Sequence, residues 1–97
     1  MNNRNRRLLD LAHRLDQCTN CDKWTEGCEP AHENGIVAGK GFGIKGQDNR
    51  HAALCHACHV AYDQGPASYE EKSEMFNRAH KRTFDLYWQN GWLRVAV

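Results

Sequence analysis

The chain has 97 residues, of which 40% are hydrophobic, so it has room for one domain with a small core. Lysines and arginines number 13 and aspartates and glutamates 12, and the resulting net charge of +1 does not by itself indicate a nucleic-acid binder. The start is polar and arginine-rich, unlike a signal peptide, and no apolar run approaches the roughly 18 residues of a membrane span. We expect a single cytoplasmic domain over residues 1–97.

The N-terminal segment predicts a helix from about Asn3 to Asp16. Its apolar residues follow the spacing i, i+3, i+4 and i+7, which places side chains on one helical face; they are Leu8, Leu11, Ala12 and Leu15. This helix should pack its apolar stripe on the core and end shortly before the first cysteine pair.

Two CxxC pairs indicate a metal site. Cys18 and Cys21 lie in a polar, turn-rich stretch, and Cys55 and Cys58 repeat the spacing. A single CxxC is also typical of a redox pair, but two such pairs are the usual source of four thiolates for tetrahedral zinc. Disulfides are rare in the cytoplasm, and an odd number of cysteines cannot all be paired. We therefore predict structural Zn²⁺ on these four cysteines.

Cys28 is the fifth cysteine, and the sequence leaves its role open. It is an alternative to Cys18 or Cys21 as a zinc ligand. We interpret it as a small buried hydrophobic residue, because unpaired cysteines are among the most buried residue types.

Glycines are concentrated between the two cysteine pairs, at Gly35, Gly39, Gly41, Gly43 and Gly46. This density predicts a loop or an irregular hairpin, because glycine is entropically costly inside regular elements. Lys40, Lys45 and Arg50 lie in or beside the stretch, and their cationic side chains are candidate nucleic-acid contacts. The pattern matches neither the P-loop nor the dinucleotide fingerprint, so an ordinary flexible loop is the alternative interpretation.

The stretch "LCHACHVAYD", residues 54–63, predicts a helix with two different faces. Cys55 and Cys58 are one turn apart near its N-terminus, where the helix dipole favours thiolates. His59 and Asp63 are four residues apart and share another face. One helix can thus carry structural cysteines on one side and a reactive site on the other.

A long helix should follow. Ser68 and Glu71 have the spacing of a capping box, and Asn90-Gly91 predicts the helix end. Apolar and small residues at helical spacing should cover the core: Met75, Phe76, Ala79, Thr83, Leu86 and Tyr87. The tail "WLRVAV" predicts one short strand.

The order of these motifs resembles the HNH superfamily of nucleases, the His-Me finger enzymes built on a treble-clef zinc finger. The first CxxC is followed by Ala31-His32, by the glycine-rich stretch, by Asp48-Asn49 and by "LCHACH". The sequence is most similar to the small nucleases of lambdoid phages and prophages, whose "GTGIKPPD"-like segment corresponds to "GFGIKGQD" here. The resemblance covers about Arg14 to Val97, nearly the whole chain.

The resemblance implies an α+β fold: a treble-clef zinc finger of zinc knuckle, β-hairpin and helix, with an N-terminal helix and a long C-terminal helix. It also implies roles for single residues. In active HNH enzymes a histidine on the first hairpin strand is the general base, which corresponds to His32. An asparagine ahead of the helix orients that base, which corresponds to Asn49. A histidine on the helix binds the catalytic ion, which corresponds to His59, with His56 or Asp63 as a candidate further ligand.

The implied activity is metal-dependent hydrolysis of phosphodiester bonds in DNA, in phage recombination or DNA processing. A base that activates water and a hard cation, Mg²⁺ or Mn²⁺, would divide the chemistry between them. The implied partners are DNA and a recombinase or another phage DNA-processing protein.

Two interpretations stay open, an active nuclease and an inactive module. The residue before the base is often a second metal ligand in HNH enzymes, and here it is Ala31, which cannot bind a metal. In the second interpretation the chain is a catalytically inactive zinc-binding treble-clef module that binds DNA or a protein partner. In that interpretation His32 fixes the hairpin by a hydrogen bond, and His59 supports the zinc ligands.

Overall fold

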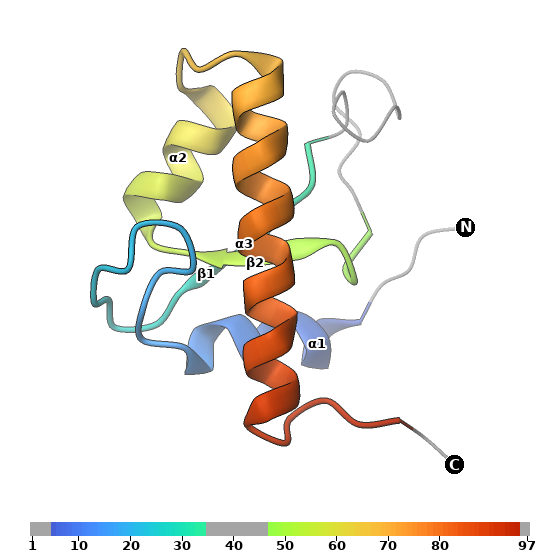
Figure 1. The fold of residues 1–97 in the computed structure, drawn as a ribbon. Helices are drawn as coiled ribbons and strands as arrows, with labels where there is room; N and C mark the ends of the chain where they lie inside the picture. The colour runs from blue at the N-terminus through green and yellow to red at the C-terminus, as the bar shows by residue number, and fades with distance from the viewer. Residues whose placement is uncertain (1–4, 35–46, 96–97) are drawn as a thin grey trace.

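The computed structural model describes residues 5–34 and 47–95 of the chain. It has a small α+β fold, in which one antiparallel pair of strands lies between helices (Figure 1). In chain order the elements are α1 (Arg6–Asp10), the 3₁₀ helix η1 (Leu11–Arg14), β1 (Glu29–His32), β2 (His51–Leu54), α2 (His56–Gln64) and α3 (Tyr69–Gln89).

The N-terminal helix is shorter than predicted. Asn5 caps α1 by accepting a hydrogen bond from the Leu8 N–H, and the helix continues as η1 only to Arg14. Leu15 is already extended and buried, because the chain must turn there into the segment that carries the first cysteine pair. The prediction of one α-helix to Asp16 is therefore wrong at its C-terminal end.

The strands β1 and β2 pair in a register that joins Glu29 to Leu54 and His32 to His51. The outer edge of β2 has no third strand among the described residues. Instead the Ala53 N–H donates to the Thr83 hydroxyl, and the Ala53 carbonyl accepts from the backbone and hydroxyl of Thr19. These side-chain contacts satisfy the edge and tie β2 to α3 and to the cysteine-bearing turn.

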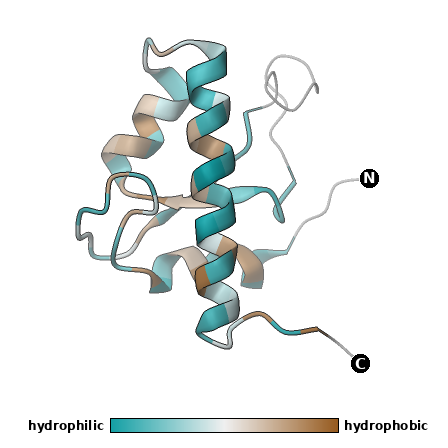
Figure 2. Ribbon diagram, viewed as in Figure 1, coloured by the Kyte–Doolittle hydropathy of each residue, from teal (hydrophilic) through white to brown (hydrophobic). Residues whose placement is uncertain are grey.

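The helix α3 has the predicted start and stop. Ser68 and Glu71 form a reciprocal capping box, and the helix ends at Gln89 before Gly91, which has a φ of 74°. Its buried residues are Phe76, Ala79, Thr83 and Tyr87, while its outward face is largely hydrophilic (Figure 2).

The hairpin separates two parts of the core. On one face Ala31, Ala52 and Leu54 pack with Tyr62, Phe76 and Cys18. On the other face Ala53 packs with residues of η1 and with Tyr87. Trp92 and Leu93 pack against this second part without forming a strand, so the predicted strand over "WLRVAV" is wrong for residues 92–95.

The glycine-rich stretch between the cysteine pairs falls almost wholly on residues 35–46, outside the described residues. The loop or irregular hairpin expected there therefore stays a prediction. The segments on either side of the stretch form the paired strands.

Candidate functional site

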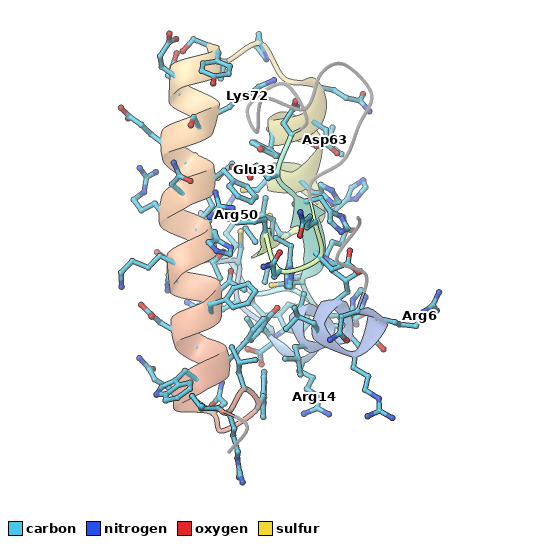
Figure 3. All side chains as sticks on the ribbon, turned by 90° about the vertical axis from the view of Figure 1, so that its right-hand side faces the viewer. Arg6, Arg14, Glu33, Arg50, Asp63 and Lys72 are labelled. Carbon is cyan, nitrogen blue, oxygen red and sulfur yellow. The ribbon has the colours of Figure 1, made fainter. Side chains whose placement is uncertain are left out.

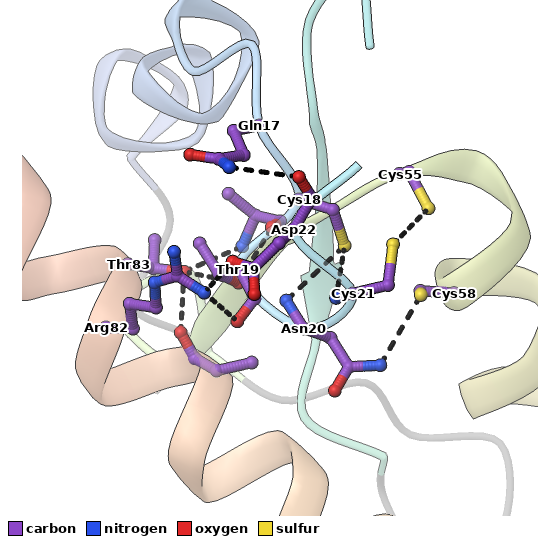
Figure 4. Close-up of polar contacts among 12 residues, drawn as sticks. Gln17, Cys18, Thr19, Asn20, Cys21, Asp22, Cys55, Cys58, Arg82 and Thr83 are labelled. Carbon is purple, nitrogen blue, oxygen red and sulfur yellow. Dashed lines mark hydrogen bonds and ion pairs between the residues drawn. The ribbon is translucent and has the colours of Figure 1, made fainter. Parts of the chain in front are cut away.

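Four cysteines meet beside the N-terminus of α2 (Figure 4). Cys18 and Cys21 lie on the turn that leads toward β1. Cys55 is the N-cap of α2, and Cys58 lies in its first turn. The turn closes with Asp22 at a φ of 66°, a left-handed conformation that reverses the chain directly after the pair.

The geometry of this cluster fits a tetrahedral zinc ion. The four Sγ atoms lie within 4.8 Å of one another, and those of Cys21 and Cys55 are 3.8 Å apart. Four sulfurs at about 2.3 Å from one zinc ion are separated by about 3.8 Å. The sulfurs also accept hydrogen bonds, as zinc thiolates commonly do: Sγ of Cys18 from the N–H groups of Asn20 and Cys21, and Sγ of Cys58 from the Asn20 amide.

Cys18 differs in acidity from the two cysteines of α2, Cys55 and Cys58. Burial raises the pKa of Cys18, but the N–H groups of Cys21, Cys55 and Asn20 outweigh burial and lower this pKa to about 7. Burial raises the pKa of Cys58 to about 12 and also raises the pKa of Cys55. The Cys18 thiolate therefore forms readily near neutral pH, whereas a metal must displace protons from Cys55 and Cys58.

Cys28 stands outside the cluster. Its side chain is fully buried among the residues of the second core region, and Sγ contacts the carbonyl of Gln17 at 3.4 Å. Burial raises the pKa of Cys28 to about 12, which makes it an unreactive thiol. The interpretation of Cys28 as a small buried residue is confirmed.

A histidine–carboxylate pair lies at the far end of β1. Nε2 of His32 is 2.8 Å from Oδ1 of Asp48, whose side chain is only 3% exposed. Nδ1 of His32 has no hydrogen-bond partner among the described residues. Because no buried side-chain nitrogen or oxygen of these residues lacks a partner, Nδ1 is not buried and reaches solvent. A carboxylate on one ring nitrogen and solvent on the other is the arrangement of a general base held in one tautomer.

Asp48 is held from three sides. Its Oδ1 atom contacts His32, its Oδ2 atom accepts from the backbone N–H of Asn5, and its carbonyl contacts Nδ1 of His51 at 2.6 Å. His51 is fully buried, and its Nε2 atom contacts the Tyr87 hydroxyl at 2.9 Å. Burial lowers the pKa of His51 to about 4, so this ring is neutral at physiological pH. The network fixes the position of the Asp48 carboxylate.

The predicted orienting residue, Asn49, is not the partner of His32. Asn49 is exposed on the turn before β2, and its neighbour Asp48 makes the contact instead. The predicted nucleic-acid contacts are placed only in part. Lys40 and Lys45 lie outside the described residues, and Arg50 is engaged by Glu33 at 2.7 Å and lies over the ring of Phe76 (Figure 3).

A second group of polar side chains joins β1 to α2. Oε1 of Glu29 is 2.8 Å from Nδ1 of His59, and Oε2 is 3.0 Å from Nδ1 of His56. On the other side of the His59 ring, Nε2 is 3.4 Å from Oδ2 of Asp63. The predicted pair of His59 and Asp63 therefore does lie on one helical face. Glu29 was not singled out from the sequence, because its contact depends on strand–helix packing across 30 residues of chain.

The helix α2 runs beside β1. Glu29 contacts His59, and farther along the chain the N–H of Asn34 donates to the Tyr62 hydroxyl at 2.7 Å. His32 lies between these two contacts in sequence. The helix that carries His59 and Asp63 therefore packs along β1.

Ala31 is fully buried, in the core region between the hairpin and α2. Among the described residues, only the four cysteines form a group of three or more close metal-ligating side chains. The face of α2 with His59 and Asp63 thus offers two ligands and no third. This suits only an ion that takes its remaining ligands from water or substrate, as Mg²⁺ commonly does.

No family model, curated protein or solved structure matches the chain. Within the part of the chain that the structure describes, no helix is both long and apolar enough to span a membrane.

Proposed function

We propose that the chain is a zinc-stabilised, metal-dependent endonuclease of the HNH type, which hydrolyses phosphodiester bonds in DNA. The observation that carries the proposal is the pair of His32 and Asp48, with one ring nitrogen on a buried carboxylate and the other at the surface. We place the protein in the cytoplasm of a phage-bearing host, where thiolates stay reduced and available for zinc.

The fold we propose is a treble clef. Its support is the order of the parts: a cysteine-bearing turn, two antiparallel strands, and a helix that begins with the second cysteine pair. Zinc on Cys18, Cys21, Cys55 and Cys58 would hold the turn to the start of α2 and thereby fix the hairpin between them.

In the proposed mechanism His32 acts as general base. Nδ1 removes a proton from a water molecule, whose oxygen forms a new bond to phosphorus while the bond from phosphorus to a sugar oxygen breaks. Asp48 holds the proton on Nε2, so that the lone pair of Nδ1 faces outward, and it stabilises the imidazolium that forms.

His59 and Asp63 would hold a divalent ion such as Mg²⁺ or Mn²⁺. When bound, such an ion supplies Lewis-acid stabilisation of the charge on the phosphoryl and leaving oxygens. The short side chain of Ala31 leaves the ion without a strand ligand, so in this chain the helix alone provides the protein contacts.

Contacts to the DNA backbone are assigned to arginines on α1. Arg6 and Arg7 are exposed, and neither is paired with an acidic side chain in the described parts of the chain. They follow Asn5, whose N–H contacts Asp48, so they begin one residue from a contact of the His32–Asp48 pair. Arg6 extends away from this helix in Figure 3. Such free guanidinium groups suit phosphate better than Arg50, which is engaged by Glu33.

A second function is favoured by Ala31 and by the absence of a third ligand near His59 among the described residues. In this alternative the chain is an inactive zinc module that binds DNA or a protein such as a recombinase, and Asp48–His32 only fixes the hairpin.

The experiment compares zinc-loaded protein on supercoiled, linear, single-stranded and branched DNA and on RNA, with and without added Mg²⁺ or Mn²⁺. Cleavage that needs the added ion supports the nuclease. Binding of DNA without cleavage of any substrate supports the inactive module.

A further inference from the structure

Glu29 reaches both histidines of α2, but the two contacts differ in quality. The contact with His59 is 2.8 Å long, and the His59 side chain is only 24% exposed. The contact with His56 is 3.0 Å long, and the His56 side chain is 79% exposed. Water competes strongly for the second contact and weakly for the first, so the Glu29 contact constrains His59 far more than His56.

An ionised carboxylate accepts hydrogen bonds and has none to donate. The Nδ1 atom of His59 that faces Glu29 must therefore carry a proton. In the neutral imidazole the other nitrogen, Nε2, then has a free lone pair. The contact with Glu29 thus selects one of the two neutral tautomers of His59.

The Nε2 atom of His59 lies beside Asp63. Nε2 and Oδ2 are 3.4 Å apart, and with Nδ1 carrying the proton both atoms are acceptors. Two ligands at about 2.1 Å from a single ion lie about 3.0 Å apart at a right angle and about 3.4 Å apart at a tetrahedral angle. The observed separation equals the tetrahedral value and exceeds the octahedral one by about 0.4 Å, so a small shift of the Asp63 carboxylate would let both atoms bind an octahedral Mg²⁺ or Mn²⁺.

We propose that Glu29 is a positioning residue, which holds His59 in the tautomer with the proton on Nδ1 and so creates a two-ligand divalent-cation site from Nε2 of His59 and the carboxylate of Asp63. This inference rests on the proposed function, because it concerns the ion of the same site. It adds a residue that belongs neither to the zinc cluster nor to the His32–Asp48 pair. A histidine ligand whose second nitrogen donates to a carboxylate is more basic and better oriented, and loss of such a partner weakens metal affinity by about 10- to 100-fold.

The test replaces the carboxylate by its amide, in Glu29→Gln, which keeps the size of the side chain. The amide can accept from Nδ1–H or donate to a bare Nδ1, so it no longer selects a tautomer. His56→Ala is the matched control, because it removes the other contact of Glu29 and leaves the contact with His59. Zinc content and the amide NMR spectrum establish that each variant is folded.

Two readouts are taken from each protein. Long-range ¹H–¹⁵N NMR of the histidine rings, in zinc-loaded protein without other metals, identifies the tautomer of His59. Titration with Mn²⁺, followed by electron paramagnetic resonance, gives the affinity of the cation site. We expect the Nδ1–H tautomer in the wild type and in His56→Ala, a mixture in Glu29→Gln, and a loss of Mn²⁺ affinity of about 10- to 100-fold only in Glu29→Gln.

An unchanged tautomer and an unchanged Mn²⁺ affinity in Glu29→Gln would overturn the proposal. So would a wild type that binds no Mn²⁺, or one whose Mn²⁺ affinity is the same in Asp63→Asn. Failure of the nuclease proposal looks different: the tautomer and Mn²⁺ affinity change as expected, but no nucleic acid is cleaved.

Discussion

Replacing Asp48 by asparagine tests the assignment of the orienting residue. The side chain keeps its shape, but one terminal oxygen becomes an NH₂ group. The backbone N–H of Asn5 needs an acceptor at one of these two positions, so the amide should turn its oxygen to Asn5 and its NH₂ group to His32. Nε2 of His32 must then accept, and the ring proton moves to Nδ1, the nitrogen that should be the base.

The size of the effect has two parts. A hydrogen bond to a charged group contributes about 1.5–3 kcal/mol, which corresponds to a loss of about 10- to 100-fold when the charge is removed. The reversed tautomer removes the base as well, and general-base catalysis contributes about 10²- to 10⁴-fold. We therefore expect Asp48→Asn to slow cleavage by at least about 10-fold and by up to about 10⁴-fold.

The assay is single-turnover nicking of supercoiled DNA by zinc-loaded protein, with Asn49→Ala as the matched control. Asn49 is the adjacent residue and is exposed, so its loss should leave the rate within about twofold. Equal rates for Asp48→Asn and wild type, or a large loss in Asn49→Ala alone, would refute the assignment of Asp48.

Three further predictions concern zinc, pH and DNA binding. A chelator should unfold the protein, as measured by circular dichroism. Binding of structural zinc contributes about 10–16 kcal/mol, and the net free energy of unfolding of a domain is only about 5–15 kcal/mol. Cys28→Ala should keep one zinc per chain. Burial lowers the pKa of His51 to about 4, below the value of about 6.5 expected in the unfolded chain. The free energy of unfolding, measured with urea, should therefore be highest above pH 6.5 and fall by roughly 3 kcal/mol as the pH drops to 4. The double variant Arg6→Gln/Arg7→Gln should lower the slope of DNA affinity against salt concentration by the equivalent of about two phosphate contacts. Arg78→Gln, at an exposed position on α3, is the control and should leave this slope unchanged.

Local signals in the sequence were sufficient for several features. Each CxxC spacing places two thiols within one turn, so the two spacings predicted which four cysteines form the cluster. The capping box at Ser68 and the glycine after α3 are equally local, and both are confirmed. The pairing of His59 with Asp63 depends only on helical spacing.

Features that depend on packing were not accessible in this way. Whether Asp48 or Asn49 faces His32 is decided by the turn before β2, which is held by the buried ring of His51. The contact of Glu29 with His59 requires α2 to lie along β1. The strand predicted for the tail failed because Trp92 packs against Tyr87 at the end of α3 instead of joining the sheet.

In the proposed nuclease, His32 is the general base. The most direct test of this role is the rate at which supercoiled DNA is nicked in Mg²⁺ or Mn²⁺ by the wild type and by a folded, zinc-loaded His32→Ala variant. We expect cleavage that depends on the added ion and is about 10²- to 10⁴-fold slower in the variant. Equal rates for the two proteins, or no cleavage by the wild type, would contradict this role.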